Sequence, residues 1–267
     1  MTTDIERQFA KMGARIKLHE REQIGSMAGV SIDIGRDRLG EFYDVSVDNR
    51  DDKNLSVLDV RPRIRHLLLS YHRPAVNTNS RFLCGHDERH WFVAAIPETS
   101  ASSSVRTAME SLKPMAVRRL QERLRVKPQK RNRRRNAAFV RQGEWFFIRI
   151  APSVRIDEWM VLRNEPLRRG NGKPHFVEEL IRVGGEAVYV SNQYPQGLTF
   201  REYQKLIGRK PELRHLQWVV QRRNPQVFVR GRVRHADHKT IFLDGWHQVL
   251  MNTETQSLAM RHVAFID

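Results

Sequence analysis

The sequence lacks the features that mark disulfide-stapled secreted domains and membrane proteins. Among its 267 residues there is one cysteine, Cys84, so no intrachain disulfide can form. No hydrophobic run approaches the ~18 apolar residues that a membrane span needs, and the stretch MTTDIERQFAKMGARIK has no apolar core of a secretory signal. A single thiol suits a reducing compartment, so we expect a cytoplasmic protein with no membrane partner.

Common catalytic motifs are also absent from the sequence. It contains no G-x-S-x-G, no H-E-x-x-H, no paired C-x-x-C and no dinucleotide-binding fingerprint. The glycine-rich loop RRGNGKP has backbone N–H groups that can cradle a phosphate, but it is no Walker A loop, because Pro174 stands where Ser or Thr is required. The sequence therefore names no reaction, and whether the protein is an enzyme stays open.

Positive charge is abundant and unevenly distributed. The 47 Lys and Arg residues exceed the 30 Asp and Glu residues, which gives a formal net charge of +17. Residues 1–117 carry a net +1, residues 118–135 carry +9 and residues 136–267 carry +7. Such a surface attracts polyanions. We expect nucleic acid, either RNA or single-stranded DNA, as a partner of the second half; a basic face that only meets solvent is the alternative.

Hydrophobic periodicity predicts an α+β protein that is mainly β. Four apolar residues at helical spacing predict a helix over residues 4–24: Ile5, Phe9, Met12 and Ile16. Short β-branched and aromatic runs then predict an antiparallel β module that ends near residue 100. A second β-rich domain spans residues 137–267 and holds one helix, which Thr199 and Glu202 begin with capping-box spacing.

The two β-rich modules are joined by a basic helical linker over residues 101–136. Pro114 suits the first turn of a helix in this linker, and Pro128 is expected to end it. The stretch KPQKRNRRRN, residues 127–136, has no apolar periodicity, so we expect it to be exposed and flexible.

The stretch Val227–Leu250 is expected to form two strands joined by a turn. Alternation places one set of side chains on a buried face: Val227, Val229, Gly231, Val233 and His235. The opposite face carries Phe228 and a row of arginines. We predict that basic residues of this stretch and of the linker bind nucleic acid through phosphates, beside aromatic residues: Arg133, Arg134, Arg135, Arg230, Arg232, Arg234 and Lys239.

Three histidines of the second half are candidate metal ligands: His175, His235 and His238. Three imidazoles are what an open, catalytic site for a divalent metal such as zinc, manganese or iron needs. Asp237 or Glu178 would orient a ligating imidazole or act as acid or base, and His247 is a fourth candidate ligand. The alternative is that these histidines bond backbone carbonyls at strand ends.

A second cluster of titratable residues lies in the first half, in Cys84-Gly85-His86-Asp87-Glu88-Arg89-His90. His86 and His90 would share a helix face and hold a metal, and Cys84 with a histidine would be a nucleophile and its base. The flanking runs look like strands, however, which favours a hairpin turn with a structural role.

The second half resembles a group of small uncharacterised bacterial proteins. The matching pieces are Arg141-Gln142-Gly143-Glu144, the run from Gly170 to His175, the H-x-x-H piece from His235 to His238, and Trp246-His247-Gln248-Val249. Where that group has paired histidines after its glycines, this chain has only His175. The resemblance implies that His175, His235 and His238 belong to one fold, and it implies no activity.

Three functions remain open at this point. The first is a nucleic-acid-associated protein with a histidine metal site, for which phosphodiester hydrolysis is the best-fitting reaction. The second is a non-catalytic module that docks another protein. The third is a cupin-like metalloenzyme that acts on a small molecule.

Overall fold

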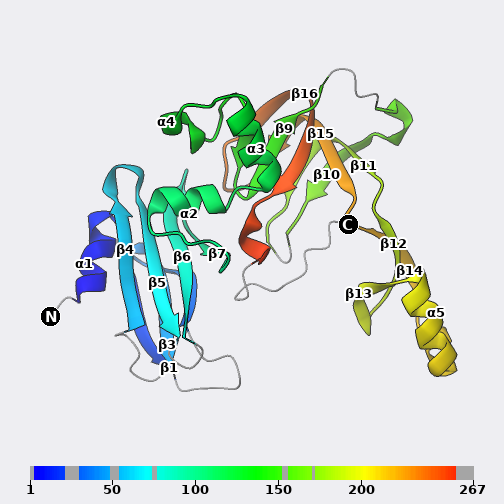
Figure 1. Ribbon diagram of the computed structural model, residues 1–267, viewed down its shortest axis with the longest axis horizontal. Coiled ribbons are helices and arrows are strands. Elements are labelled where there is room, and N and C mark those ends of the chain that lie inside the picture. The colour runs from blue at the N-terminus through cyan, green and yellow to red at the C-terminus, as the bar shows by residue number, and fades with distance from the viewer. Residues whose placement is uncertain are drawn as a thin grey trace. The chain divides into compact units, whose positions relative to one another are not determined.

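The computed structural model describes residues 3–21, 30–48, 54–73, 77–151, 156–169 and 172–256, and it is β-rich throughout (Figure 1). The expected α+β, mainly β class is therefore confirmed. The chain divides into two compact units: residues up to Ala138 together with the segment that starts at Met251, and residues Phe139–Leu250. Within the described ranges, every helix is too short or too polar to cross a membrane.

The first unit contains two sheets. One has the strand order β1-β3-β2, in which β1 runs parallel to β3, and the other is the antiparallel meander β4-β5-β6-β7. The bounds are β1 Ile16–Arg21, β2 Val30–Asp37, β3 Gly40–Asp48, β4 Leu55–Arg61, β5 His66–Arg73, β6 Thr78–Asp87 and β7 His90–Ile96, with a 3-10 turn at Pro62–Ile64. The expected antiparallel pairing holds except between β1 and β3.

Both faces of the meander are buried. Tyr43 and Val45 of β3 pack with Leu67 and Leu69 of β5 in one core, and neighbours along the same strand, such as Leu68, pack with α2 in another. This follows from the period-2 alternation of strand side chains. The continuous apolar run of β5 is thus typical of a strand covered on both sides.

The first helix is shorter than the sequence predicts. The helix α1 spans Asp4–Lys11 behind a capping box of Thr3 and Glu6. Met12 closes it and Gly13 has a φ of +77°, a conformation that favours glycine and ends a helix. Ile5, Phe9 and Met12 do face the core, but Ile16 begins β1, so the expected helix over residues 4–24 was wrong beyond Met12.

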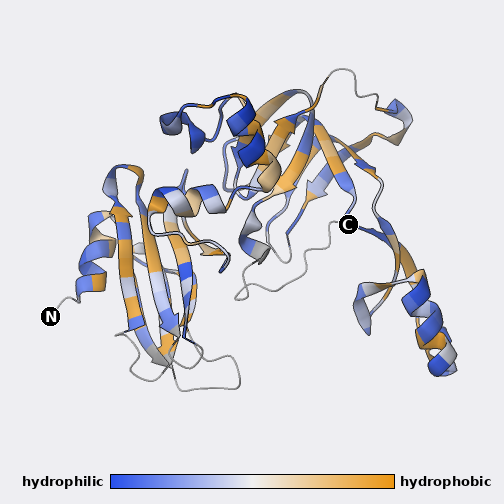
Figure 2. Cartoon of the chain, in the orientation of Figure 1, coloured by the Kyte–Doolittle hydropathy of each residue, from blue (hydrophilic) through white to orange (hydrophobic). Residues whose placement is uncertain are grey.

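The basic segment 101–136 folds as part of the first unit. Its helices are α2 Val105–Ser111, α3 Met115–Arg123 and α4 Pro128–Arg131, of which α3 and α4 are mainly hydrophilic (Figure 2). Pro114 is the N-cap of α3, one residue before the first turn where it was expected, and Pro128 begins α4 although it was expected to end a helix. The buried side chains of Lys113 and Gln121 both donate hydrogen bonds to the carbonyl of Arg131. The segment 127–136 is therefore tied to the first unit by hydrogen bonds, and much of it is exposed, as expected.

The second unit is built on a six-stranded antiparallel sheet of order β10-β11-β15-β16-β9-β8. Its strands are β8 Val140–Gln142, β9 Trp145–Arg149, β10 Leu162–Leu167, β11 His175–Val183, β15 Gln226–Arg234 and β16 Ile241–Met251. The side chain of Gln142 in edge strand β8 donates to the carbonyl of Val233 in β15. Because these strands are not neighbours in the sheet, the sheet must curl so that its edge returns over β15.

A smaller sheet of order β13-β12-β14 is inserted between β11 and β15, with helix α5 beside it. Its elements are β12 Glu186–Ser191, β13 Tyr194–Thr199, α5 Phe200–Arg209 and β14 Val219–Arg223, and the unit also has 3-10 turns at Glu158–Met160 and Pro211–His215. The predicted capping box of Thr199 and Glu202 is confirmed. A last 3-10 turn, Thr253–Gln256, belongs to the first unit, where the backbone N–H of Thr253 donates to the carbonyl of Leu112.

The predicted hairpin of β15 and β16 is confirmed, but its faces are not as expected. In β15, Val229 pairs with Leu180 and Val233 pairs with Val177 across β11, with a register shift between them. Leu180 and Val177 are three residues apart, so they lie on opposite faces of β11. The bulge therefore places Val229 and Val233 on opposite faces, and both are fully buried.

Candidate metal centre

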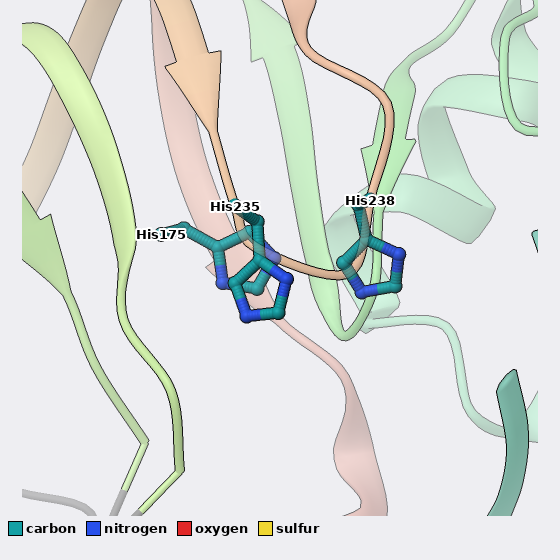
Figure 3. Close-up of side chains that lie close together, drawn as sticks. All are labelled: His175, His235 and His238. Atoms are coloured by element: carbon teal, nitrogen blue, oxygen red, sulfur yellow. The ribbon is translucent and has the colours of Figure 1, made fainter. Parts of the chain in front are cut away.

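Three imidazoles from two separate segments converge in the second unit. His175 is the first residue of β11, while His235 and His238 lie in the turn that joins β15 to β16 (Figure 3). Each residue offers a ring nitrogen, and these nitrogens lie within 4.8 Å of one another. In the part of the chain that the structure describes, this is the group of histidine, cysteine and carboxylate side chains that can hold a metal ion, and it contains no carboxylate.

The rings are close and nearly parallel. The ring centroids of His175 and His235 are 4.1 Å apart, those of His235 and His238 are 4.7 Å apart, and those of His175 and His238 are 5.5 Å apart. In a tetrahedral zinc site, ligand nitrogens at the usual Zn–N length are ~3.3 Å apart. The most distant pair of nitrogens would therefore have to approach by up to about 1.5 Å to share one ion.

His175 is the most constrained of the three. It is only 2% exposed, and among the described residues neither of its ring nitrogens has a hydrogen-bond partner. Burial, with the nearby rings of His235 and His238, lowers the pKa of His175 to about 3. The imidazole is therefore neutral at physiological pH, which is the protonation state that ligates metals. The expectation that such histidines bond backbone carbonyls does not hold for His175.

The turn between β8 and β9 forms one wall of the site. Gly143 in this turn has a φ of +56°, and a Cβ built on it would lie 3.1 Å from Nε2 of His238 and 3.2 Å from Nε2 of His175. Only a residue without a side chain leaves this space open. Gln142 anchors the turn, since its Nε2 donates to the carbonyl of Lys239 at 2.7 Å, next to His238.

Other buried polar atoms gather around His175. Gln142 and Trp145 are cross-strand partners, and the rings of Trp145 and His175 are 6.4 Å apart. Within the described part of the chain, Oε1 of Gln142 and Nε1 of Trp145 also have no hydrogen-bond partner, and both side chains are at most 2% exposed. Buried polar groups are nearly always paired, so a cluster of unpaired ones indicates a place for a bound ion or water.

His235 differs from His175 because its nitrogens are engaged. Its Nδ1 accepts from the backbone N–H of Asp237 at 3.1 Å, so its proton is on Nε2, which donates to the carbonyl of Lys173 at 3.3 Å. To ligate a metal, His235 must exchange one of these hydrogen bonds for a metal–nitrogen bond. The longer bond to Lys173 is the easier one to give up.

An open pocket of about 510 Å³ adjoins the imidazoles. It is lined by Asn164, Lys173, Pro174, Phe176, Arg234, His235 and Ala236. His235 belongs both to this lining and to the imidazole group, so a molecule in the pocket reaches the edge of the candidate metal site. The lining contains two cations and no carboxylate.

The two predicted acid or base residues occupy different places. Asp237 lies in the same turn as His235 and His238, and its carboxylate pairs with Nζ of Lys173 at 2.9 Å. Glu178 is three residues after His175 in β11 and therefore points to the opposite face, where it accepts from the backbone N–H of Arg232. The expectation that Glu178 orients a ligating imidazole was wrong for His175. His247, the fourth candidate ligand, lies outside the group, since its Nδ1 meets the carbonyl of Gly245.

The expected row of arginines is divided by the bulge. Arg230 is half-buried, pairs with Glu158 and Glu179, and lies over the ring of Trp246. Arg232 and Arg234 are exposed, and Arg234 donates to Oδ1 of Asn164 at 2.6 Å. The side chain of Lys239 is also exposed. The structure thus places Arg232, Arg234 and Lys239 at the surface and ties Arg230 to carboxylates.

The predicted phosphate-binding residues of the basic segment belong to the first unit. Arg133 and Arg135 are exposed, whereas Arg134 pairs with both Asp87 and Glu88. The structure does not bring these three arginines into one row. Arg134 instead fixes the basic segment to the turn between β6 and β7.

That turn is the second cluster of titratable residues, and it is structural. Cys84 is fully buried, which raises the pKa of its thiol well above the usual range. His86 packs edge-on against Trp91, and Nδ1 of His90 meets Oε1 of Glu41 at 2.5 Å. The sequence-based preference for a hairpin turn is confirmed, because β6 ends at Asp87 and β7 begins at His90.

Sequence reasoning missed Gln142, Gly143 and Trp145 as parts of the site. A glycine in a two-residue hairpin turn indicates only a tight turn. The residues next to Gly143 in the sequence do not predict that this turn contacts an imidazole. The motif Arg141-Gln142-Gly143-Glu144 was the available signal. The comparison of the chain with protein-family models, with curated proteins and with solved structures found no match.

Proposed function

We propose that the second unit binds one divalent metal ion through His175, His235 and His238 and uses it to hydrolyse phosphodiester bonds in nucleic acid. The observation that carries the metal part of this proposal is the buried, neutral His175, whose two ring nitrogens have no partner among the described residues. Burying a polar group without a hydrogen bond costs about 1–3 kcal/mol in protein variants. A metal bond would offset that cost.

The donor set favours a catalytic site over a structural one. Structural zinc sites are closed by four protein ligands, whereas three histidines leave one position for water. A divalent ion held there would lower the pKa of its bound water to about 7 and so supply a nucleophile at neutral pH. The absence of a carboxylate in the group suits zinc, and nitrogen ligands also accept manganese or iron.

The surroundings favour a phosphate ester as the substrate. Lys173 and Arg234 line the pocket beside His235 and would bind the negative charge of a phosphate. In the reaction the oxygen of water forms a bond to phosphorus, one phosphorus–oxygen ester bond breaks, and the departing oxygen takes up a proton. Asp237, through its ion pair, holds Lys173 where it can stabilise the charge on the phosphate.

The net charge of +17 supports nucleic acid as the source of that phosphate. The exposed side chains of Arg232, Arg234 and Lys239 surround the same turn. The proposal places the protein in the cytoplasm, where a buried free thiol such as Cys84 stays reduced.

The experiment that tests this function is a metal titration followed by an activity assay. The full chain is stripped with a chelator and titrated with zinc, and we expect one equivalent to bind. Replacing either His235 or His238 by Ala should weaken zinc binding by at least ~100-fold, because loss of a ligand exceeds the 10–100-fold effect of losing a group behind a ligand. Hydrolysis of bis(4-nitrophenyl) phosphate and of a labelled single-stranded oligonucleotide should require the metal.

His215→Ala is the matched control, because His215 is exposed in the 3-10 turn after α5 and far in sequence from the site. It should leave zinc binding and hydrolysis unchanged. Zinc that is lost on dialysis from the unmodified chain would contradict the metal site. Zinc that binds without hydrolysis of either substrate would leave the metal site standing and remove the hydrolase.

A further inference from the structure

The pocket beside the imidazoles has two kinds of surface. Pro174, Phe176 and Ala236 supply apolar and aromatic area, while Lys173 and Arg234 supply positive charge. Phe176 is 39% exposed although its chain neighbour His175 is buried, because alternate residues of β11 point to opposite faces. A ligand that satisfies both surfaces has a flat apolar part and an anionic part.

The aromatic and cationic groups are held next to each other by strand pairing. Phe176 and Arg234 are cross-strand partners in β11 and β15, so their side chains emerge side by side on one face. Among the described residues, the guanidinium of Arg234 donates a hydrogen bond to Oδ1 of Asn164, which uses one of its five N–H groups. The remaining N–H groups are available for a phosphate.

The same face continues across the next strand. Arg232 is two residues from Arg234 and so shares its face, and Arg232 pairs with Phe242 of β16. Phe242 is 60% exposed. The surface therefore runs from Phe176 across the arginines of β15 to Phe242. Two exposed aromatic rings flank two guanidinium groups, an arrangement that suits bases that stack and phosphates between them.

We propose that this pocket binds a nucleoside phosphate, with the base stacked on Phe176 and the phosphate on Arg234, and that a single strand continues over Arg232 to Phe242. A volume of about 510 Å³ fits a small molecule and not a duplex. Because His235 lines the pocket, the phosphate lies beside His235, the imidazole that the pocket shares with the candidate metal site. The role of the pocket as a substrate site rests on the proposed function, whereas binding in it does not.

Binding of each probe to the pocket is measured in the presence of a chelator, so that neither metal-dependent hydrolysis nor the metal itself contributes to the affinity. The probes are adenosine 5′-monophosphate, ribose 5-phosphate, inorganic phosphate and a short single-stranded oligoadenylate. The full chain should bind the mononucleotide more tightly than the two phosphates without a base. Phe176→Ala should weaken mononucleotide and oligonucleotide binding by between about 5- and 150-fold, the range for loss of one stacked base.

Replacing Phe242, the second exposed ring, tests whether the ligand is a free nucleotide or the end of a single strand. Phe242→Ala should weaken oligonucleotide binding by about 5-fold or more and leave mononucleotide binding unchanged. If Phe242→Ala changes neither, the surface ends at the pocket and the ligand is a free nucleotide, which overturns the strand part of the proposal. Arg234→Gln should weaken both probes and reduce the salt dependence of oligonucleotide binding.

Two exposed residues elsewhere in the second unit give the controls. Trp159→Ala removes an aromatic ring that is 84% exposed, and Arg201→Gln removes an exposed charge of α5. Losses in these controls that equal those of Phe176→Ala and Arg234→Gln would overturn the pocket and show unspecific attraction. Equal affinity for inorganic phosphate and the mononucleotide would also overturn it. Neither result affects zinc binding, so the metal site is judged separately.

Discussion

Both units gather titratable side chains at the turn of an antiparallel hairpin, and the two turns have opposite characters. At the turn between β6 and β7, Asp87, Glu88 and His90 meet charged partners from the rest of the first unit: Arg134 pairs with the two carboxylates and Glu41 pairs with His90. At the turn between β15 and β16, a distant strand supplies a third imidazole, His175, with no hydrogen-bond partner in the described part of the chain.

The difference shows that local density of ligating residues is a poor guide to a site. Five such residues within seven positions form a structural hairpin turn, while three imidazoles spread over more than sixty positions include His175, whose two ring nitrogens have no hydrogen-bond partner in the described part of the chain. A protein folds more stably when buried polar groups are paired. An unpaired buried group that persists in a well-packed sheet is therefore better evidence for a ligand than a cluster of ligating residue types.

The sharpest way to break this comparison is to remove the histidines of the turn between β6 and β7 and, separately, the buried His175 of β11. The double variant His86→Ala and His90→Ala should leave zinc affinity within about 2-fold of the unmodified chain, whereas His175→Leu should lower it by at least ~100-fold. Isothermal titration with zinc measures both. Equal losses in the two variants would mean that zinc binding does not depend specifically on His175, against our interpretation.

The same His175→Leu variant has a second expected effect. Replacing an unpaired buried polar group by an apolar one of similar size is neutral or stabilising, so the metal-free variant should be as stable as the unmodified chain or more stable by about 1 kcal/mol. Urea denaturation in a chelator measures this. A loss of more than about 2 kcal/mol would mean that His175 has a structural role.

The open space over the imidazoles can be filled through the turn between β8 and β9. Gly143→Ala should weaken zinc binding by about 10-fold, because the new Cβ would crowd Nε2 of His175 and His238. Gly13→Ala is the control, since Gly13 also has a positive φ but meets no atom within 4 Å. Both variants should lose about 1 kcal/mol of stability from backbone strain; a loss of zinc affinity in both would remove Gly143 from the site.

Comparing variants of Arg134 and Arg133 tests which basic residues stabilise the fold and which are available to bind phosphate. Arg134→Gln should lower the free energy of unfolding by about 1 kcal/mol, because Asp87 and Glu88 lose a charged partner, and Arg133→Gln should change it by less than about 0.5 kcal/mol. Thermal unfolding measures both. Oligonucleotide binding that falls more in Arg134→Gln than in Arg133→Gln would show that the ion pairs open to bind phosphate.

The smallest effect concerns Glu178, a carboxylate that shares the exposed face of Phe176. Glu178→Gln should raise single-strand affinity about 2-fold at low salt, since one like charge is removed from the path of the phosphates. Fluorescence anisotropy at two salt concentrations measures this. A fall in affinity would mean that Glu178 is needed to position Arg232, whose backbone N–H it accepts.

Much of the fold follows from local pattern. The alternation of Val227–Leu250 gives a hairpin, and Thr199 with Glu202 gives the start of α5, because capping and pleat depend only on nearby residues. The helix expected over residues 4–24 extended too far, since a helical spacing from Met12 to Ile16 continued across Gly13. The bulge in β15 had one local signal, Gly231, whose φ is +84°.

The candidate site was predictable only in its residue types. His235 and His238 share a turn in the sequence, so their proximity is local. His175 meets them because the register of β11 against β15 pairs Phe176 with Arg234. Gly143 and Trp145 could not be assigned, because their approach to His175 depends on how far the sheet curls.

The sequence by itself determined the β-rich class, the excess of positive charge and the three imidazoles that suit a divalent ion, since these depend on composition and on neighbours in the chain. The tertiary structure decided which imidazole is buried without a partner and which arginines pair with carboxylates. It also decided that the pocket lies on the face of β11 that carries Phe176. Those outcomes depend on strand register and sheet curvature, where a one-residue shift moves a side chain to the other face. That is why two turns with similar residues differ so completely in what their side chains contact.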